Sequence, residues 1–488
     1  MQKPFYLTTT LPYVNAELHM GHALEFVRAD AIARYHRDIL GEDVFFNSGT
    51  DEHGSKIFKK AEELGMTAQE FVDMNVAKFH ESLGLFGLMD GMHFIRTTDA
   101  HHIVAAQEFW KRVSDNGYIY KKNYQTKYCV GCESEKTDSE LVDGKCPDHG
   151  VAPELIDEEN YFFKYSAFGE KLLEFYTKNP TFIIPDFRFN EIKAFIERGL
   201  EDFSVSRLAT KMPWGIPVPG DADQVMYVWF DALTNYISTL GWPHSAKAPR
   251  GTAEVEGDFE KYWVNGTPTQ YCGKDNTRFQ GAMWQAMLMA AGLPNSHQIV
   301  VNGFVMGDGG VKMSKTLGNV VDPKDIAREF GIDALRFFLL KEISSFEDSP
   351  FSRERFVESY NAHLANGIGN LTSRIMKMAS TNLTQTFEMP EKSLPEAWLT
   401  AMDAYDIKAA AECAFHEAKL MDERITETEP FKLVKTDKVA GDAIISELVV
   451  RLYTVARMLA PLLPETSRKI KEAVEANTMP SEPLFARK

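Results

Sequence analysis

The sequence predicts an α/β protein in which a doubly wound parallel sheet is interrupted by an insertion and followed by a helical region. Three observations support this fold class. Strand-like and helix-like segments alternate over the first hundred residues, cysteines and short β-like runs break the alternation from about residue 118, and amphipathic helical patterns fill the chain after residue 322. Because 488 residues are too many for one hydrophobic core, several domains are expected.

The first segments follow the order strand, helix, strand, helix. FYLTTT at residues 5–10 predicts a strand, and a helix is expected from Glu17 to Ile39, with Gly41 ending it. DVFFNSGTDEHG at residues 43–54 predicts a second strand that runs into a loop, and SKIFKKAEELG at residues 55–65 predicts the next helix. This order is typical of a parallel sheet that binds ligands at the carboxyl ends of its strands.

The middle of the chain interrupts this pattern and then restores it. Between about Tyr118 and Gly220, short β-like pieces, turns and cysteines indicate an insertion. QVMYVWFDALTNYIST and TPTQYCGKDNTRF restore the alternation, and QIVVNGFVM predicts a further strand. Asp322 followed by Pro323 is a favourable helix start, and apolar residues recur at helical spacing from there to the end of the chain.

Composition limits the class of protein. A hydrophobic content of 44% and a charged content of 25% describe an ordinary globular protein. No segment resembles a signal peptide or a membrane span, so no membrane partner is expected. Five cysteines in so long a chain do not make a disulfide framework, and a cytoplasmic location is expected. The net charge of −17 argues against a protein coated in nucleic acid, although local basic patches could still bind an RNA.

A group of cysteines inside the insertion has the spacing of a metal site. Cys129 and Cys132 form one pair, and Cys146 and His149 form a second with the same spacing. Three thiolates and one imidazole in two such knuckles favour a closed tetrahedral Zn²⁺ site, which would be structural because no position is left for water. The alternative is a set of buried thiols with a surface histidine.

Two further motifs point to a polyphosphate. His19 and His22 flank Met20 and Gly21 near the start of the first helix, where free N–H groups and the helix dipole attract anions. The two histidines alone could also be metal ligands or packing residues. The later loop GDGGVKMSKTLGN carries Lys312 and Lys315, which suit a clamp on phosphates, although a generic basic loop would look similar. Together the motifs predict a nucleotide site.

These motifs, taken in order, resemble those of the methionyl-tRNA synthetases, a family of class I aminoacyl-tRNA synthetases. HMGH resembles the HIGH signature and KMSKT the KMSKS loop, and TTTLPYVNAELHMGH, SGTDEHG, the two knuckles, YVWFDALTNY, GKDNTRFQ and NGIGNLTSR extend the likeness over nearly the whole chain. The resemblance implies that methionine reacts with MgATP to give methionyl-adenylate, and that the 3'-terminal adenosine of tRNA(Met), initiator tRNA included, then takes the methionyl group. ATP, L-methionine and tRNA(Met) are thus the implied partners, and Zn²⁺ and Mg²⁺ the implied cofactors.

The resemblance also implies which residues act. The catalytic residues would be His19, His22, Lys312 and Lys315, and ATP would be bound by these four with Gly21, Asp275 and Ser314. Asp51 would hold the substrate ammonium. The full set expected to bind methionine is Thr10, Leu11, Tyr13, Asp51, Trp229, Ala232, Tyr236, Asn276 and Gln280.

The sequence departs from the family pattern in this expected methionine pocket. Gln280 stands where a histidine commonly follows the GKD motif, Leu233 replaces a common proline, and Thr10 stands where alanine is frequent. Methionine remains the expected substrate, while activation of a different amino acid stays open. The chain could also be a small-molecule nucleotidyltransferase or an inactive RNA-binding relative of the synthetases.

The resemblance finally implies a domain order and an RNA-binding face. Asn370 and Arg374 match anticodon readers and lie four residues apart, on one helix face. Phe431 replaces a usual tryptophan and could stack on a base. Because no further C-terminal domain follows, a monomer is expected. The expected domains are residues 1–117 and 223–322 for the two halves of a Rossmann-like catalytic domain, 118–222 for a connective insertion with the zinc knuckle, 323–355 for a stem-contact region directly after the KMSKT loop, and 356–488 for an all-α anticodon-binding domain.

Overall fold

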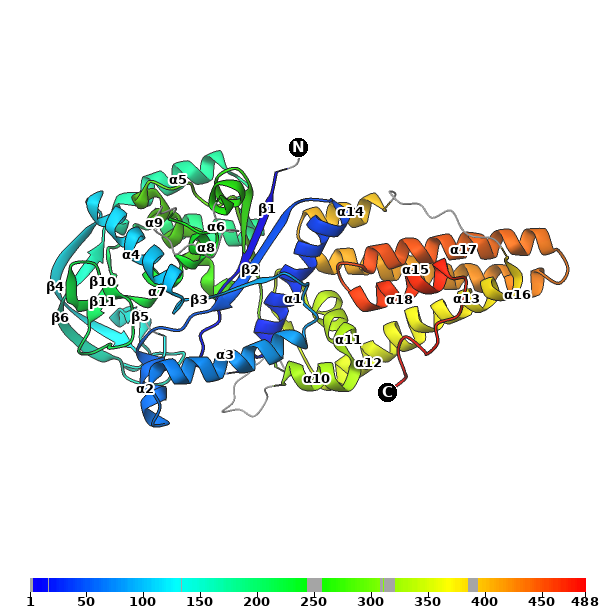
Figure 1. Cartoon of the computed structure of the whole chain (residues 1–488), viewed down its shortest axis with the longest axis horizontal. Helices are drawn as coiled ribbons and strands as arrows, with labels where there is room; N and C mark the ends of the chain where they lie inside the picture. Colours follow the sequence, from blue (N-terminus) through cyan, green and yellow to red (C-terminus); the bar gives the residue numbers. More distant parts are fainter. Residues whose placement is uncertain are drawn as a thin grey trace. The chain divides into compact units, whose positions relative to one another are not determined.

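The computed structural model describes residues 3–15, 17–132, 134–243, 257–307, 310, 321–384 and 394–488. The chain forms two compact units (Figure 1). Unit 1 comprises Met1–Leu18, Asp43–Glu81 and Gly91–Val301, and unit 2 comprises His19–Glu42, Ser82–Asp90 and Asn302–Lys488. Each unit therefore contains segments that are far apart in the sequence.

A six-stranded sheet with the order β3-β2-β1-β12-β13-β7 forms the centre of unit 1. β1 pairs in parallel with β2 and with β12, β2 pairs in parallel with β3, and β13 pairs in parallel with β7. The strand order reverses beside β1, which is the arrangement that creates a ligand crevice at the carboxyl ends of the strands. The doubly wound parallel sheet predicted from the alternation is confirmed. The strands are β1 (Phe5–Thr9), β2 (Val44–Thr50), β3 (His93–Arg96), β7 (Ile183–Ile184), β12 (Thr267–Gly273) and β13 (Gln298–Asn302).

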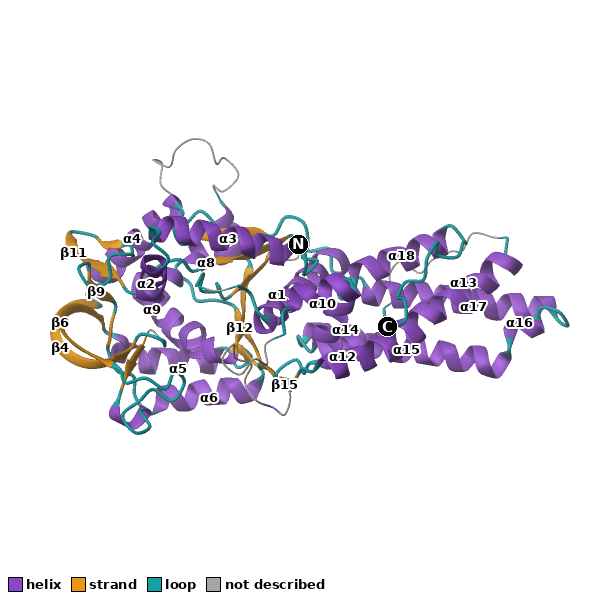
Figure 2. Cartoon of the chain, turned by 90° about the horizontal axis from the view of Figure 1, so that it is seen from below, coloured by secondary structure: helices purple, strands orange, loops and turns teal. Residues whose placement is uncertain are grey.

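Helices pack around this sheet (Figure 2), and buried aromatic side chains contribute to the core between them. Phe109 of α4 stacks on Trp284 of α9 with ring centroids 5.4 Å apart, and Trp110 contacts Phe230 edge to face. The helices of unit 1 are α2 (Ser55–Glu63), α3 (Ala68–Gly84), α4 (Ala100–Asp115), α5 (Gly169–Lys178), α6 (Asp186–Glu197), α7 (Val228–Ala232), α8 (Asn235–Ser238) and α9 (Trp284–Ala291). Shorter helical turns are η2 (Asp138–Glu140), η3 (Tyr165–Phe168), η4 (Phe259–Val264), η5 (Lys274–Asn276) and η6 (Phe279–Met283).

The predicted insertion forms antiparallel sheets. β4 and β6 pair over ten residues, and β5 continues from the end of β4 as a short hairpin. The segment that was expected to restore the parallel pattern begins differently, because Gln224–Met226 lies in β11 and pairs antiparallel with β9. These strands are β4 (Ile119–Cys129), β5 (Ser134–Lys136), β6 (Glu154–Phe163), β8 (Phe203–Ser204), β9 (Ser206–Leu208), β10 (Pro217–Val218) and β11 (Asp221–Met226).

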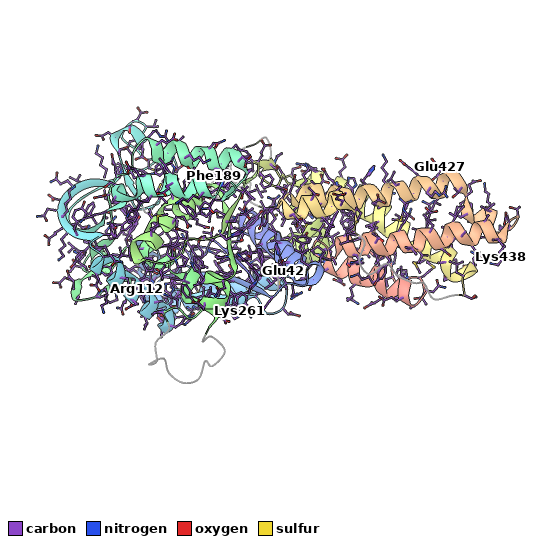
Figure 3. All side chains as sticks on the ribbon, turned by 90° about the horizontal axis from the view of Figure 1, so that it is seen from above. Glu42, Arg112, Phe189, Lys261, Glu427 and Lys438 are labelled. Carbon is purple, nitrogen blue, oxygen red and sulfur yellow. The ribbon has the colours of Figure 1, made fainter. Side chains whose placement is uncertain are left out.

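Unit 2 is mainly helical, as the C-terminal pattern predicted. Asp322 caps α10, because its side chain accepts a hydrogen bond of 2.8 Å from the Lys324 N–H. Figure 3 shows Glu427 and Lys438 at the same end of this unit, on α15 and α17. The elements are α1 (Met20–Arg34), η1 (Tyr35–Ile39), β14 (Val305–Met306), α10 (Pro323–Phe330), α11 (Ile332–Phe337), η9 (Phe338–Glu342), β15 (Ser349–Pro350), α12 (Arg353–Ser359), η10 (Tyr360–Gly369), α13 (Asn370–Asn382), α14 (Glu396–Asp403), α15 (Ile407–Thr428), α16 (Pro430–Leu433), α17 (Lys438–Leu459) and α18 (Pro464–Glu475).

Buried ionic groups bind α1 to the other helices of unit 2. The Arg28 guanidinium donates to backbone carbonyls at the end of η9, including those of Ser344 at 2.7 Å and Ser345 at 2.9 Å. The Asp30 carboxylate lies 2.7 Å from Arg336 and 2.8 Å from Arg34. Charges buried in this way need partners, so α1 is an integral part of the helical unit.

Among the residues that the structure describes, no helix is both long enough and apolar enough to cross a bilayer.

Candidate functional site

The two histidines of HMGH form the amino end of α1. The helix starts at Met20, three residues later than expected, because His19 is its N-cap. The His19 Nδ1 atom accepts the Gly21 N–H at 3.1 Å, and the His22 Nδ1 atom accepts the His19 N–H at 3.2 Å. The two rings stack with centroids 3.8 Å apart. With both Nδ1 atoms used as acceptors, each neutral ring carries its proton on Nε2, so that two donors are held at a helix N-terminus.

Burial, with a smaller contribution from His19, lowers the pKa of His22 well below 6.5. The His22 imidazole is therefore neutral near pH 7. It can donate a hydrogen bond to an anion, but it does not add a full positive charge.

Gly21 has a local reason to be glycine. A Cβ at this position would lie 3.0 Å from the His19 Cε1 atom and 3.2 Å from its Nδ1 atom. The resemblance places Gly21 among the residues that bind ATP, and in the structure the His19 ring lies where a Cβ of residue 21 would be.

The lysine loop is the second motif of the predicted nucleotide site. Lys312, Ser314 and Lys315 lie outside the described residues.

Three of the predicted binding residues follow the carboxyl ends of neighbouring strands in unit 1. Thr10 follows β1, Asp51 follows β2, and Asp275 follows β12 in the next helical turn. Tyr13 forms a bridge with Asp51, and the Val14 N–H donates to the Asp51 carbonyl at 3.0 Å. The sheet thus gathers these residues at the edge where α/β proteins bind ligands.

A buried group that the sequence reasoning missed supports this edge. The Asp231 carboxylate lies between two imidazoles, 3.0 Å from His53 Nδ1 and 3.3 Å from His102 Nε2. Burial alone would raise the pKa of Asp231, but the two histidines outweigh it and lower that pKa. The Tyr13 hydroxyl donates to the His53 carbonyl at 2.7 Å, so the group also fixes Tyr13. The TDEHG and WFDAL motifs contain two of its members, although neither motif indicates that they pair.

Aromatic side chains provide apolar surface in the same unit. The Trp229 ring stacks on Phe279 with centroids 3.8 Å apart and an interplanar angle of 4°. Trp229 and Tyr13 both pack against a small cluster of Tyr128, Tyr227 and Val228. Phe279 was not predicted, although it directly precedes Gln280 in GKDNTRFQ. Of the remaining predicted residues, Leu11, Ala232 and Tyr236 are buried, Asn276 is half-buried, and Asp275 is exposed.

Two departures from the family pattern meet in the structure. The Gln280 side-chain amide donates to the Thr10 hydroxyl at 2.7 Å, and Gln280 is 1% exposed. Both polar substitutions are therefore parts of one hydrogen-bonded pair.

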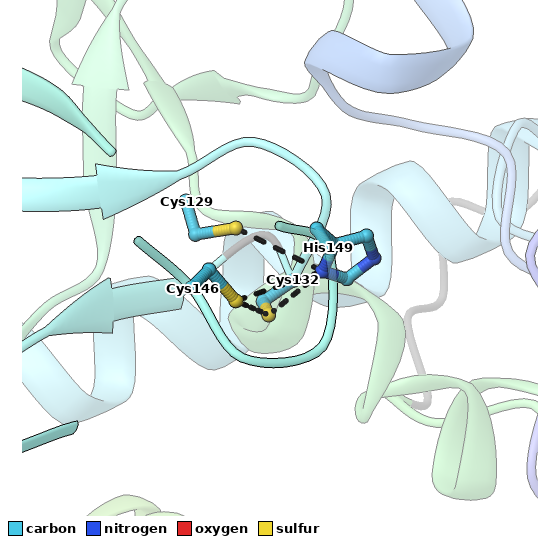
Figure 4. Close-up of side chains that lie close together, drawn as sticks. All are labelled: Cys129, Cys132, Cys146 and His149. Carbon is cyan, nitrogen blue, oxygen red and sulfur yellow. Dashed lines mark hydrogen bonds between the residues drawn. The ribbon is translucent and has the colours of Figure 1, made fainter. Parts of the chain in front are cut away.

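The predicted metal ligands converge (Figure 4). The ligand atoms of Cys129, Cys132, Cys146 and His149 all lie within 4.8 Å of one another. Cys132 Sγ is 3.4 Å from Cys146 Sγ and 3.3 Å from His149 Nδ1, and the Cys129 Sγ is 3.9 Å from that nitrogen. A tetrahedral zinc site with Zn–S bonds of about 2.3 Å has ligand–ligand edges of about 3.8 Å, so the donor set fits such an ion.

The residues expected to read an anticodon lie on two helices of unit 2. Asn370 begins α13 and is exposed, and Arg374, one turn later, forms an ion pair with Asp422 of α15. Phe431 lies on α16 with 44% of its surface exposed.

Comparisons with known proteins agree with this arrangement. The family model "tRNA synthetases class I (M)" matches residues 5–152 and 149–376. The chain is 39% identical over 487 residues to the methionine–tRNA ligase of Caldanaerobacter subterraneus subsp. tengcongensis, covering 97% of this chain and 74% of that protein. It is 38% identical to the ligase of Rhizobium meliloti, covering 97% and 92%. The structure resembles Mycobacterium tuberculosis methionyl-tRNA synthetase in complex with methionyl-adenylate, with a TM-score of 0.87, 33% identity and coverage of 99% of both chains.

Proposed function

This chain belongs to the family of class I tRNA synthetases (M), and on that premise we propose that it activates L-methionine with ATP and transfers it to tRNA(Met). In the first step a carboxylate oxygen of methionine bonds to the α-phosphorus, the bond from that phosphorus to the bridging oxygen breaks, and pyrophosphate leaves. In the second step a ribose hydroxyl at the 3' end of the tRNA bonds to the methionyl carbonyl carbon and loses its proton, the bond from that carbon to the phosphate oxygen breaks, and AMP leaves.

The observation that carries this proposal is the imidazole pair at the start of α1. Both Nδ1 atoms accept backbone N–H groups, so the neutral His22 ring keeps its proton on Nε2, where it can donate to a phosphate oxygen. Fixed donors stabilise the charge that develops on phosphate oxygens during displacement without needing to reorganise. Lys312 and Lys315 would add positive charge from their loop, and the resemblance also assigns Gly21, Ser314 and Asp275 to ATP binding.

The proposed methionine site uses the strand ends of unit 1. Asp51, which is 8% exposed, supplies a negative charge for the substrate ammonium, since a desolvated ammonium requires a counter-charge. Tyr13 and Trp229, with Leu11, Ala232 and Tyr236, supply an apolar and aromatic wall that suits a polarisable thioether. Asn276, Thr10 and Gln280 supply polar contacts.

We assign the helices of unit 2 to the anticodon. Asn370 and Arg374 are one turn apart on α13, and Phe431 offers an exposed ring for stacking on a base. To bind RNA, Arg374 must break its ion pair with Asp422. Breaking a surface ion pair costs little free energy, so the contact with RNA would be reversible. The domain order expected from the sequence, with its catalytic halves and connective insertion, remains part of this proposal.

We infer that the three thiols and His149 hold Zn²⁺, which when bound would cross-link the β4–β5 hairpin to the loop that follows it. Four protein ligands leave no position for a substrate, so this role is structural. Mg²⁺ would accompany ATP. No disulfide joins any of the five cysteines, all of which the structure describes, and this is consistent with work in the reducing cytoplasm.

Gly131 provides a test of the metal proposal. It lies between the two thiols of the first knuckle, and a Cβ there would lie under 3.0 Å from ring atoms of His149. Gly131→Ala should therefore displace the imidazole and weaken zinc binding about 10- to 100-fold, the range found when the surroundings of metal ligands are changed. Zinc affinity is measured by competition with a chromogenic chelator.

Gly169→Ala is the matched control, because nothing lies within 4 Å of a Cβ at that glycine. If Gly131→Ala binds zinc as tightly as the unmodified protein, the close packing of His149 on Gly131 does not hold the imidazole in place as a zinc ligand.

The substrate proposal is tested by amino-acid-dependent exchange of pyrophosphate into ATP, run with all twenty amino acids. We expect exchange with methionine, and transfer of methionine to tRNA(Met) transcripts in a second assay. Strong exchange with a different amino acid and none with methionine would support the proposed reaction but contradict methionine as its substrate.

A further inference from the structure

A chain of buried polar side chains runs behind Gln280. Gln270 and Gln285 are 0% exposed, Gln280 is 1% exposed, and Ser296 is 3% exposed. With Thr10 at its end, this set is the glutamine relay. Buried amides and hydroxyls require hydrogen-bond partners, and the relay supplies them from within.

One end of the relay is anchored by backbone groups, whose roles as donor or acceptor are unambiguous. The Ser296 N–H donates to Gln285 Oε1 at 3.1 Å, and Gln285 Nε2 donates to the Gln280 carbonyl at 2.8 Å. An N–H can only donate and a carbonyl can only accept, so the Gln285 amide has one permitted orientation.

This orientation is passed along the relay. Gln285 Nε2 donates to Ser296 Oγ at 3.0 Å, and that hydroxyl donates to Gln270 Oε1 at 2.5 Å. Gln270 Nε2 then donates to Gln280 Oε1 at 3.1 Å. Because the oxygen of Gln280 is used as the acceptor, its Nε2 faces Thr10, where it donates at 2.7 Å. A flip of any one amide would set two donors or two acceptors against each other.

The Thr10 end of the relay adjoins residues of the proposed methionine site. Gln280 directly follows Phe279, whose ring stacks on Trp229, and Thr10 directly follows β1. One proton of the Gln280 nitrogen is used toward Thr10, and the second remains for a ligand of the amino-acid subsite, while the oxygen is occupied by Gln270.

We propose that the glutamine relay selects the amino-acid side chain by holding Gln280 as a hydrogen-bond donor, and that Gln270, Ser296 and Gln285 are positioning residues for this selection. This inference rests on the proposed function. A thioether has lone pairs and no proton, so it can accept from Gln280, although weakly. Norleucine has the same length as methionine but replaces sulfur with a methylene, so it gains nothing from the donor.

The experiment compares methionine with norleucine in pyrophosphate exchange. Ser296 is buried and joins Gln285 to Gln270, so Ser296→Ala breaks the relay between these two residues. We expect this variant to lower kcat/KM for methionine about three- to fivefold through KM, and to leave kcat/KM for norleucine unchanged. Gln280→Leu should lower the methionine-to-norleucine ratio by the same factor. In the Gln280→Leu background, Ser296→Ala should have no further effect on that ratio.

Gln298→Ala is the control, because Gln298 lies on nearby β13 and bonds only to the Thr181 carbonyl among the contacts described. An equal loss for methionine and norleucine in Ser296→Ala would show a structural role and overturn the proposal. If thermal melting shows that Ser296→Ala does not fold, Gln280→Leu decides, and an unchanged ratio overturns the proposal. Absence of methionine-dependent exchange in the unmodified protein would instead refute the proposed function itself.

Discussion

His22→Asn is expected to slow adenylate formation about 100- to 1,000-fold, while the affinity for methionine stays the same. The asparagine Oδ1 can occupy the place of Nδ1 and still accept the His19 N–H, so the helix cap is kept. What is lost is the donor at the Nε2 position. Loss of one fixed donor to a developing negative charge typically costs 10²–10³ in kcat, which is about 3–4 kcal/mol. Single-turnover formation of adenylate measures the rate, and calorimetry measures methionine binding.

His22→Gln is the matched variant, because a glutamine amide reaches the Nε2 position and can donate from there. It should retain a rate within about tenfold of the unmodified protein. The lowered pKa of His22 supports a neutral donor, so a positively charged replacement is not needed. Equal losses in the asparagine and glutamine variants would show that the Nε2–H donor is not what His22 contributes.

The parts of the fold that were predicted from sequence depend on local patterns. Alternating strand and helix signals predicted the parallel sheet, Asp322 and Pro323 predicted the start of α10, and two knuckles predicted the metal cluster. Each of these follows from the spacing of residues along a short segment. The antiparallel pairing of β11 was not predicted, because partners of a strand are set by distant segments and not by its own sequence.

For the site, too, the sequence predicted motifs within short segments but not the contacts between distant residues. HMGH indicated a phosphate site, but it could not show that His19 and His22 cap the helix and stack on each other. The contacts of Asp231 with His53 and His102 join positions more than a hundred residues apart. Likewise, Thr10 and Gln280 looked like two separate departures, and only the fold shows that they bond to each other. Such pairs are tertiary contacts, which cannot be read from a single sequence.

Replacing Arg336 with methionine is expected to destabilise unit 2 by about 3–5 kcal/mol. Arg336 is 0% exposed, and its guanidinium contacts Asp30 at 2.7 Å. It also donates to four backbone carbonyls, those of Phe86, Gly87, Pro461 and Leu462. Methionine fills similar space but cannot donate, so a buried carboxylate and several carbonyls lose a partner. Urea unfolding followed by far-ultraviolet circular dichroism measures the change, since unit 2 is mainly helical.

The surface pair of Arg468 and Glu472 provides the contrast, because Arg468→Ala should change stability by less than about 1 kcal/mol. Combining Arg336→Met with Asp30→Asn should recover part of the loss, since the carboxylate that Arg336 neutralised is then uncharged. Asp30 also accepts from Arg34 and from the Met89 N–H at 2.6 Å, so recovery should be incomplete. If the loss of stability in the double variant equals the sum of the two single losses, Asp30 and Arg336 are not coupled as a pair, and the carbonyl contacts alone account for the burial of Arg336. If they are coupled, the ion pair fixes α1 within the helical unit, and with it the two histidines at its amino end.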